Sequence, residues 1–322
     1  MESLRKLLVP FSVVYDVITR VRNWAFDNGI LKQETFDIPI IAVGNLSTGG
    51  TGKTPMIEWL INHHKGKKIA VLSRGYGRST TGFIELNNLH TAQEVGDEPL
   101  QIKSKFGNTI VSAVCEKRAD GIKRLMAAHT LDLILLDDAY QHRYVKASHY
   151  ILLTSYSNLF YDDLILPAGN LRESSAGVKR AQTIIVTKCP VDISKAEMET
   201  IKHKIAPLSY QRVHFSKITY HSALKNDYEE LPLDKVAFSE VTAVTGIAKP
   251  APFISFLKEK FKVEHLVYGD HHRFRESEIN IFKKRKIIIT TEKDYKRLAP
   301  WNLSNVYYLE MRMEFINSQP DL

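Results

Sequence analysis

The sequence is poor in features that would define a class of protein by themselves. Only two of its 322 residues are cysteines, Cys115 and Cys189, and they lie far apart in the chain. Two distant cysteines support neither a disulfide framework nor a zinc site, and a reducing compartment is the simpler interpretation. There is no internal repeat and no low-complexity segment. With 44% hydrophobic and 25% charged residues, the composition is that of an ordinary globular protein.

Long apolar runs are missing as well. The uncharged run Leu7–Tyr15 is far shorter than the ~20 residues that a membrane-spanning helix needs, and no small-residue cleavage site of a signal peptide follows it. Residues 1–34 nevertheless carry recurring apolar side chains among charged ones. Two interpretations stay open: a helix packed on the domain, and an interfacial helix with Trp24 and Phe26 on its apolar face.

An excess of acidic residues is also absent. Lys and Arg outnumber Asp and Glu by 44 to 36, which gives a formal net charge of +8. This balance favours anionic partners, namely phosphates, acidic lipid surfaces or nucleic acid, and charge alone does not choose among them.

The chain is organised around residues 38–54, which read IPIIAVGNLSTGGTGKT. An apolar run typical of a buried parallel strand leads into a glycine-rich loop, and a helical pattern with Pro55 in its first turn follows. This order predicts a P-loop, in which backbone N–H groups, a helix N-terminus and a lysine bind phosphate. Ser47 replaces the first glycine of the pattern, and Thr54 is placed to offer its hydroxyl to Mg²⁺. The predicted phosphate-binding residues are Ser47, Thr48, Gly49, Gly50, Thr51, Gly52, Lys53 and Thr54.

A second anchor is the apolar run that ends in Asp137-Asp138 within Leu131–Arg143. A Walker B strand delivers a carboxylate to the carboxyl edge of the sheet, within reach of the metal that the P-loop holds. Because this run lies downstream of a P-loop, it predicts Asp137 or Asp138 as a ligand of Mg²⁺.

Further apolar runs alternate with helical patterns, which predicts an α/β fold with a mostly parallel sheet and flanking helices. A polar stretch near residues 207–225 predicts a domain boundary, since roughly 150 residues per domain is the usual size. The expected strands include Lys68–Ser73, Ile110–Val114, Tyr150–Thr154, Thr183–Thr187 and Ile287–Thr291.

Asp97 precedes Glu98 and Pro99 in a pattern typical of a helix N-cap. A carboxylate at a helix mouth is equally placed to accept a hydroxyl proton, and the local sequence does not separate the two interpretations. Elsewhere, Pro190 stands where a guanine-reading N/T-K-x-D motif needs aspartate, so guanine specificity finds no support. His271 and His272 are adjacent, which makes a shared metal geometrically awkward.

In order and spacing, these motifs resemble the tetraacyldisaccharide 4′-kinases (lipid A 4′-kinases) of Gram-negative bacteria, over about residues 40 to 296. That family's phosphate loop also lacks the usual first glycine. Ala139 and Tyr140 are conservative departures from its glycine and phenylalanine. The motifs that carry the resemblance are Val43–Asn45 with Gly49–Pro55, Ser73–Gly77, Gly96–Pro99, Arg118, Asp137–His142, Pro167–Glu173, Asp270-His271 and Thr291–Asp294.

The resemblance implies an ATP- and Mg²⁺-dependent kinase, with the active site between two domains. It would phosphorylate the 4′-hydroxyl of tetraacyldisaccharide 1-phosphate to form lipid IVA, at the cytoplasmic face of the inner membrane. The implied partners are this anionic glycolipid and the membrane surface, with no nucleic acid and no obligate protein partner. The expected domains are an N-terminal amphipathic segment (1–34), a P-loop kinase core (35–212) and a smaller α/β domain that closes the active site (213–322).

With this resemblance, Asp97 is expected to accept the proton of the sugar hydroxyl, positioned by His271. Lys53 is expected to bind the β- and γ-phosphates, and Arg118 and Arg172 to neutralise developing charge. Two rivals remain: a P-loop ATPase switch, and a non-catalytic protein that binds membranes or nucleic acid. The expected metal-binding residues are Thr54, Glu98, Asp137 and Asp138.

Overall fold

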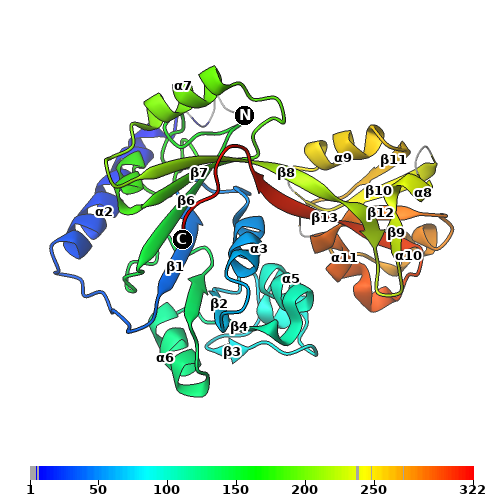
Figure 1. Cartoon of the computed structure of the whole chain (residues 1–322), viewed down its shortest axis with the longest axis horizontal. Helices are drawn as coiled ribbons and strands as arrows, with labels where there is room; N and C mark the ends of the chain where they lie inside the picture. The colour runs from blue at the N-terminus through cyan, green and yellow to red at the C-terminus, as the bar shows by residue number, and fades with distance from the viewer. Residues whose placement is uncertain (1–4, 6, 237–238, 248, 271) are drawn as a thin grey trace. The chain divides into compact units, whose positions relative to one another are not determined.

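The computed structural model describes residue 5 and residues 7–236, 239–247, 249–270 and 272–322. The backbone is a mixed α/β structure whose strands are mostly parallel (Figure 1). The chain divides into two compact units. Unit 1 comprises Met1–His90, Glu94–Ile218 and Met313–Leu322, and unit 2 comprises Thr91–Gln93 and Thr219–Arg312.

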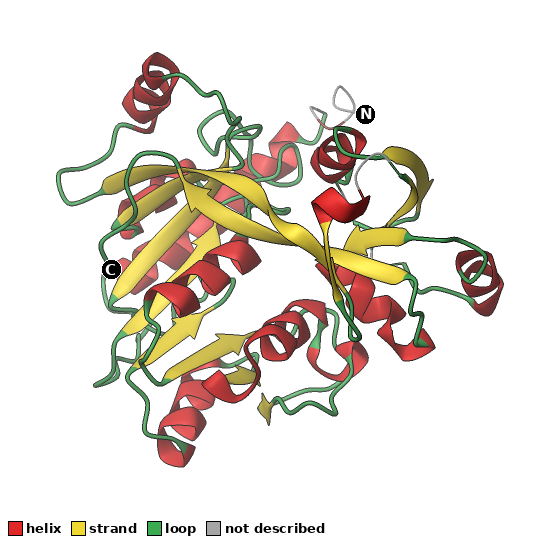
Figure 2. Ribbon diagram, turned by 45° about the vertical axis from the view of Figure 1, so that its right-hand side comes forward, coloured by secondary structure: helices red, strands yellow, loops and turns green. Residues whose placement is uncertain are grey.

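Strands and helices alternate over most of unit 1, and Figure 2 shows helices packed beside the strands of the sheet. The elements up to the seventh helix are, in chain order, α2 (Val9–Asp27), β1 (Ile40–Asn45), α3 (Lys53–His63), β2 (Ile69–Ser73), β3 (Ile84–Glu85), α4 (Ala92–Val95), α5 (Asp97–Phe106), η1 (Gly107–Thr109), β4 (Ile110–Val114), α6 (Arg118–Ala128), β5 (Leu133–Leu136), β6 (His149–Ser155), η2 (Ser175–Arg180), β7 (Thr183–Thr187) and α7 (Lys195–Ile205).

The sheet of unit 1 is built around β1. Its strand order is β7-β6-β1-β5-β2-β4-β3, and all these pairings are parallel except that of β3 with β4. Ala42 of β1 lies beside Leu136 of β5 and Tyr150 of β6. Because β1, β2 and β5 are buried along their whole length, they read as continuous apolar runs, as strands covered on both faces do.

Alternate side chains of β1 enter two different cores. Ile41 and Val43 belong to one core, and Ile40 and Ala42 belong to the other, as the two-residue period of a strand requires. The first core takes Met56, Ile57, Leu60 and Ile61 from α3. The second takes Ala119, Ile122 and Leu125 from α6. The apolar residues of the helical pattern that follows the P-loop therefore form the face of α3 that packs on the sheet.

Unit 2 contains a smaller sheet, in which β10–β13 pair in parallel, with helices on it. β10 lies between β11 and β12, and β13 pairs with β12. Val241 and Ala243 of β10 share a core with α9, and Val244 shares one with α10 and α11. The remaining elements of the chain are β8 (Arg212–Lys225), β9 (Glu230–Pro232), α8 (Leu233–Val236), β10 (Glu240–Thr245), α9 (Ala251–Lys258), β11 (Lys262–Val267), α10 (Glu276–Phe282), β12 (Ile288–Thr291), α11 (Glu292–Leu298), η3 (Ala299–Trp301) and β13 (Val306–Phe315).

The polar stretch near residues 207–225 contains a strand. β8 pairs in parallel with β7 through Arg212–Phe215 and antiparallel with β9 through Ala223–Lys225. Most of its residues are only partly buried, so it lacks the apolar run that identifies the central strands. Both β8 and β13 contribute residues to each unit.

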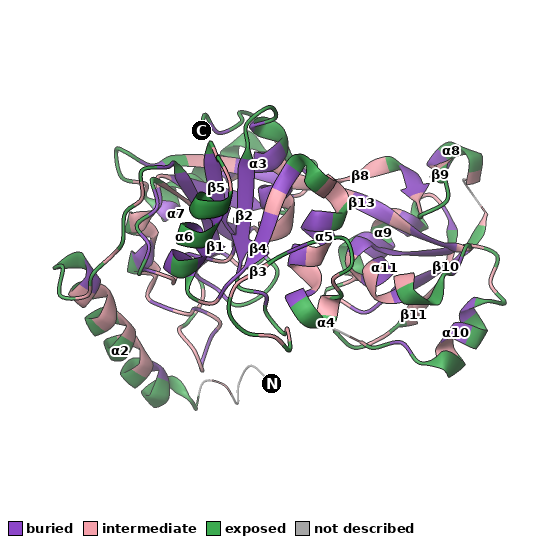
Figure 3. Cartoon of the chain, turned by 90° about the horizontal axis from the view of Figure 1, so that it is seen from below, coloured by how far each residue is buried: buried purple, intermediate pink, exposed green. Residues whose placement is uncertain are grey.

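The N-terminal helix α2 turns its polar side toward the protein. Ser12 Oγ donates to the carbonyl of Ile165 at 2.9 Å, and Asn23 Nδ2 donates to Glu173 Oε2 at 2.7 Å. Figure 3 shows exposed and half-exposed positions along most of this helix. Its exposed large apolar side chains are Val9, Phe11, Val13, Val14, Val17, Ile18, Val21 and Trp24.

One detail of the expected interfacial face differs. Phe26 is buried, with 3% of its surface exposed, and it packs edge-on against Tyr144, with the Arg143 guanidinium 5.1 Å from its ring centroid. It anchors the end of α2 and does not belong to the exposed face that carries Trp24. None of the described helices is long and apolar enough to cross a membrane.

Candidate functional site: a phosphate loop and an aspartate pair

The glycine-rich loop joins the end of β1 to the start of α3. Gly49 and Gly52 have φ values of +108° and +89°, in the region that side chains with a Cβ rarely adopt. Gly52 is the N-cap of α3 and Lys53 its first residue. The loop therefore ends at a helix N-terminus, where backbone N–H groups and the helix dipole favour an anion.

The place of the missing glycine has a backbone conformation that serine adopts readily. Ser47 forms an antiparallel bridge with Leu171, and the flanking residues continue this pairing. Arg172 N–H donates to the Leu46 carbonyl at 2.7 Å, and Thr48 N–H donates to the Asn170 carbonyl at 2.7 Å. Segment 170–172 thus holds the entry of the loop, and no left-handed residue is needed there.

Lys53 lies between the loop and the predicted Walker B carboxylates. Its Nζ is 3.6 Å from Asp138 Oδ1 and 3.4 Å from Asn45 Oδ1. Thr54 is half-buried in the first turn of α3. The structure thus brings the lysine of the loop to one of the two aspartates that the sequence placed at the carboxyl edge of the sheet.

The two aspartates follow β5 and differ in their surroundings. Asp137 is buried, accepts a hydrogen bond from Ser73 Oγ at 3.2 Å on Oδ2, and has no hydrogen-bond partner for Oδ1 in the described structure. Burial raises the pKa of Asp137 to about 7, and the charges of Glu98 and Asp138 add to this effect. An ionised carboxylate here calls for a further cation.

Asp138 is held in its ionised form. Burial acts to raise its pKa, but Lys53 and Arg172 outweigh burial and hold the pKa below the ordinary value. Arg172 Nη1 lies 3.1 and 3.3 Å from the two oxygens of Asp138. Asp138 itself has a left-handed backbone, with φ of +46°, which aspartate tolerates better than most residues.

The two candidate arginines play different parts. Arg118, at the start of α6, is almost completely buried and donates to the carbonyls of Cys115 at 2.5 Å and Asp137 at 3.1 Å. Burial lowers its pKa to about 10, which still leaves the guanidinium charged at neutral pH. Arg118 therefore fixes the backbone of the aspartate pair, whereas the Arg172 side chain is about 29% exposed.

Asp97 and Glu98 are the first two residues of α5 and are half-buried. The expectation that Asp97 caps this helix is wrong by one residue, because the N-cap is Gly96, with φ of +92° and ψ of 152°, and no side-chain hydrogen bond caps the helix. A Cβ at Gly96 would lie 3.2 Å from the Tyr76 carbonyl oxygen, so the close approach of that loop favours glycine. His271, the expected partner of Asp97, lies outside the described residues.

A buried carboxylate that the sequence did not single out organises the loop after β6. Glu173 is 3% exposed and accepts from Arg180 at 2.7 and 2.9 Å and from Gln141 at 3.0 Å. Gln141 also donates to the Asn45 carbonyl at 2.9 Å and lies 3.4 Å from Arg172 Nη1. The motif residues Gln141 and Glu173 thus hold Arg172 and the end of β1 in place. The only sequence feature that could have pointed to Gln141 and Glu173 is that each lies in one of the polar motifs.

Positive charge surrounds His142, just beyond the aspartate pair. Burial lowers the pKa of His142 to about 4, and the charges of Arg118, Arg22 and Arg74 act in the same direction. The imidazole is therefore neutral at pH 7, while the arginines keep this side of the site cationic. Arg22 comes from α2, where its Nη2 donates to the Gln141 carbonyl at 2.9 Å.

The donor set fits Mg²⁺ bound together with a nucleotide. Among the described residues, no group of three or more His, Cys, Asp or Glu side chains can hold a metal ion. Mg²⁺ in kinases commonly takes only one or two carboxylates and completes its shell with phosphates and water. The unpaired buried Oδ1 of Asp137, with Asp138 beside it, matches that need.

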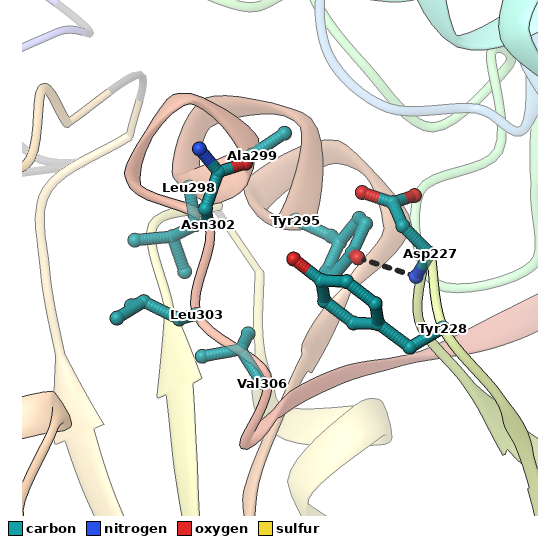
Figure 4. Close-up of a pocket in the computed structure, with 8 residues that line it drawn as sticks. All are labelled: Asp227, Tyr228, Tyr295, Leu298, Ala299, Asn302, Leu303 and Val306. Atoms are coloured by element: carbon teal, nitrogen blue, oxygen red, sulfur yellow. Dashed lines mark hydrogen bonds between the residues drawn. The ribbon is translucent and has the colours of Figure 1, made fainter.

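A pocket in unit 2 contains none of the predicted site residues (Figure 4). Asp227 and Tyr228 lie on one side of it, and the Tyr295 hydroxyl accepts a hydrogen bond from the Asp227 N–H at 2.9 Å. The rest of the lining is mainly apolar.

The loop, its lysine and the aspartate pair on the adjacent strand have the arrangement of a P-loop phosphotransferase. The sequence profile of the LpxK family, tetraacyldisaccharide-1-P 4′-kinase, matches residues 4–322 of this chain. The chain belongs to this family.

Named relatives and a solved structure agree with this assignment. The tetraacyldisaccharide 4′-kinase of Flavobacterium psychrophilum is 48% identical over 99% of this chain and 95% of its own. That of Bacteroides thetaiotaomicron is 40% identical over 99% and 91%. The "apo" form of LpxK from Aquifex aeolicus, in complex with ATP, has a TM-score of 0.80 and 29% identity, and the match covers 98% of this chain and 96% of that one.

Proposed function

We propose that this chain transfers the γ-phosphoryl group of ATP to the 4′-hydroxyl of tetraacyldisaccharide 1-phosphate, which forms lipid IVA in lipid A biosynthesis. The observation that carries the proposal is the contact of Lys53 with Asp138 beside a glycine loop that ends in a helix N-terminus. Membership of the tetraacyldisaccharide-1-P 4′-kinase family supplies the acceptor. The related LpxK in complex with ATP supplies the donor.

The residues of the phosphate loop have separable tasks in this reaction. The loop N–H groups and Lys53 bind the β- and γ-phosphates. Asp137 and Asp138, with Thr54 and Glu98, would hold Mg²⁺, which neutralises phosphate charge when it is bound. The salt bridge from Lys53 to Asp138 has a length of 3.6 Å, so phosphate oxygens compete for this lysine when nucleotide binds.

The remaining site residues act on the acceptor and on the charge that develops. Asp97 takes the proton of the 4′-hydroxyl. We assign to His271 the role of positioning Asp97. Arg172, whose side chain is partly exposed beside Asp138, neutralises charge on the transferred group. Arg118 keeps Asp137 in place through the main chain. Because the phosphoryl-transfer transition state is loose, most of the rate comes from positioning and charge stabilisation.

The acceptor's own charge suits the site. A disaccharide 1-phosphate is an anion, and Arg22 and Arg74 make the region around His142 cationic. The net charge of +8 also favours approach to anionic lipid.

We also propose that the protein acts as a peripheral protein on the cytoplasmic face of the inner membrane. A helix at the surface of a soluble protein normally turns its apolar side inward, and α2 does the opposite. Phe11, Ile18 and Trp24 expose 66%, 60% and 58% of their surface. Ser12 and Asn23, in contrast, donate hydrogen bonds to segment 165–173 of unit 1. An exposed apolar face of this kind marks an interaction site, and a lipid substrate places that site at a membrane.

The assay that tests the proposed function compares variants of the two key groups. Asp97→Asn keeps the shape of the side chain and removes its basicity, so transfer to the lipid is expected to fall by roughly 10²- to 10⁴-fold. ATP affinity, measured by calorimetry, should stay within about twofold. Lys53→Met is expected to lose ATP binding and transfer together.

Lys65→Met is the matched control, because Lys65 is exposed just beyond α3 and outside the site; it should behave as the wild type does. Full transfer by Asp97→Asn would remove Asp97 as the base. ATP hydrolysis without labelled lipid in the wild type would instead support an ATPase switch.

A further inference from the structure

The carboxyl end of β7 holds the phosphate loop from the side. Thr187 Oγ1 donates a hydrogen bond to the Thr51 carbonyl at 2.7 Å, and Lys188 Nζ donates one to the Gly50 carbonyl at 2.6 Å. Two neighbouring residues of one strand end therefore bind two successive carbonyls of the loop. Neither residue has a part in the reaction proposed above.

These donors come from a fixed backbone. The Thr187 carbonyl accepts from Tyr156 N–H at 2.9 Å, and Cys189 N–H donates to the Ser216 carbonyl at 2.9 Å. Lys188 between them has φ of +58°, in a left-handed conformation that costs a non-glycine residue free energy. Surrounding contacts must hold such a residue in place, and its conformation directs the lysine side chain to Gly50.

The contact with Thr51 determines where a loop N–H points. A trans peptide is planar, so its carbonyl and the N–H of the next residue point in opposite directions. Because the Thr51 carbonyl is bound to Thr187, the Gly52 N–H is turned away from β7. Gly52 caps α3, and its N–H belongs to the helix N-terminus that favours phosphate.

The loop is also packed on the β7 side. A Cβ built on Gly52 would lie 3.7 Å from the Met313 methyl group and 3.9 Å from Thr187 Cβ. A Cβ on Gly50 would lie 3.7 Å from Lys188 Nζ. Lys188 thus adds a second ammonium group beside the loop, and its hydrogen bond to the Gly50 carbonyl polarises the Gly50–Thr51 peptide.

We propose that Thr187 and Lys188 are positioning residues of the phosphate loop: through the Thr51 and Gly50 carbonyls they preorganise it for the phosphates of the nucleotide. The proposal deepens the function proposed above and rests on its nucleotide site. Its effect is on nucleotide binding, because a loop that must be ordered by the ligand binds that ligand less tightly. A positioning group far from the acceptor leaves the chemical step largely unchanged.

The test measures MgATP binding by calorimetry, KM for ATP, kcat and thermal stability for Lys188→Met. Loss of a charged hydrogen bond is expected to raise the Kd and KM for ATP roughly tenfold, with kcat within about twofold. Lys188 is exposed, so the melting temperature should stay that of the wild type. Lys188→Arg keeps a charged donor and should recover much of the affinity.

The matched control is Lys195→Met, which removes an exposed lysine at the start of α7 and should change neither constant. Thr187→Val and Thr187→Ser form a second pair, in which serine keeps the hydroxyl and should bind ATP more tightly than valine does. If Lys188→Met bound MgATP as tightly as the Lys195→Met control, the proposal would be wrong.

The outcome separates this proposal from the proposed function. Wild-type protein that binds MgATP but phosphorylates no lipid would overturn the proposed function, and the binding comparison would still decide the role of Lys188. A fall in melting temperature with unchanged ATP affinity would assign Lys188 to folding alone and overturn the proposal.

Discussion

Ser47 occupies the one position where the phosphate-loop pattern lacks its glycine, and the structure gives the reason. Its backbone forms an antiparallel bridge with Leu171 and does not have a positive φ, so any residue can stand there. The left-handed conformations fall on Gly49 and Gly52 instead. The glycine requirement at a given position therefore follows from the local backbone, and a motif pattern records it only indirectly.

Ser47→Gly is accordingly expected to bring no gain in ATP affinity. It should lower the free energy of unfolding by about 0.5–1 kcal/mol, because glycine loses more backbone freedom on folding. Gly52→Ala should do more harm, since φ of +89° strains an alanine by roughly 1 kcal/mol or more and distorts the helix N-terminus. ATP titration and urea unfolding of both variants check this, and tighter ATP binding by Ser47→Gly would contradict it.

At the scale of the element, α2 has its hydrophobic face on the wrong side for a helix that serves only the fold. Its polar residues are bound to segments 141–143 and 165–173, and this accounts for the first of the two interpretations left open by the sequence. The exposed apolar face is what the second interpretation needs. The helix can satisfy both at once, because the two faces are different.

Ile18→Asp tests the exposed face. Ile18 is 60% exposed, so the fold should keep its melting temperature. Binding to vesicles that contain anionic lipid should fall roughly tenfold or more, because an inserted apolar side chain is replaced by a charge. Flotation of the protein with vesicles measures this. Leu89→Asp, at an apolar residue that is 89% exposed elsewhere, is the control, and equal loss in both variants would count against a role of α2.

At the scale of the whole molecule, the sequence predicted best where a strand is buried on both faces. β1, β2 and β5 are continuous apolar runs, and the P-loop and Asp137-Asp138 follow two of them directly. The sequence did not predict β8 as a strand, because its residues are mostly half-buried. Such a strand shows no regular alternation of apolar and polar residues.

The sequence also predicted only part of the candidate site. Lys53, Asp138 and Arg172 were predicted from motifs, and the structure brings them together. Thr187 and Lys188 were considered only as part of a guanine-reading motif that Pro190 excludes, because their contacts are with carbonyls of residues far away in the sequence. Such contacts between distant segments depend on the order of strands in the sheet, in which β7 lies two strands from β1. The local sequence does not encode that order.

The product that the wild-type protein forms decides whether it is a 4′-kinase of this lipid. Purified protein is incubated with γ-labelled MgATP and tetraacyldisaccharide 1-phosphate in detergent micelles, and the lipid is analysed by mass spectrometry, with Lys53→Met beside it. We expect the lipid to gain one phosphate, located on the 4′-hydroxyl, and to gain none with the variant. An unmodified lipid with consumed ATP, or phosphate on any other hydroxyl, would contradict it.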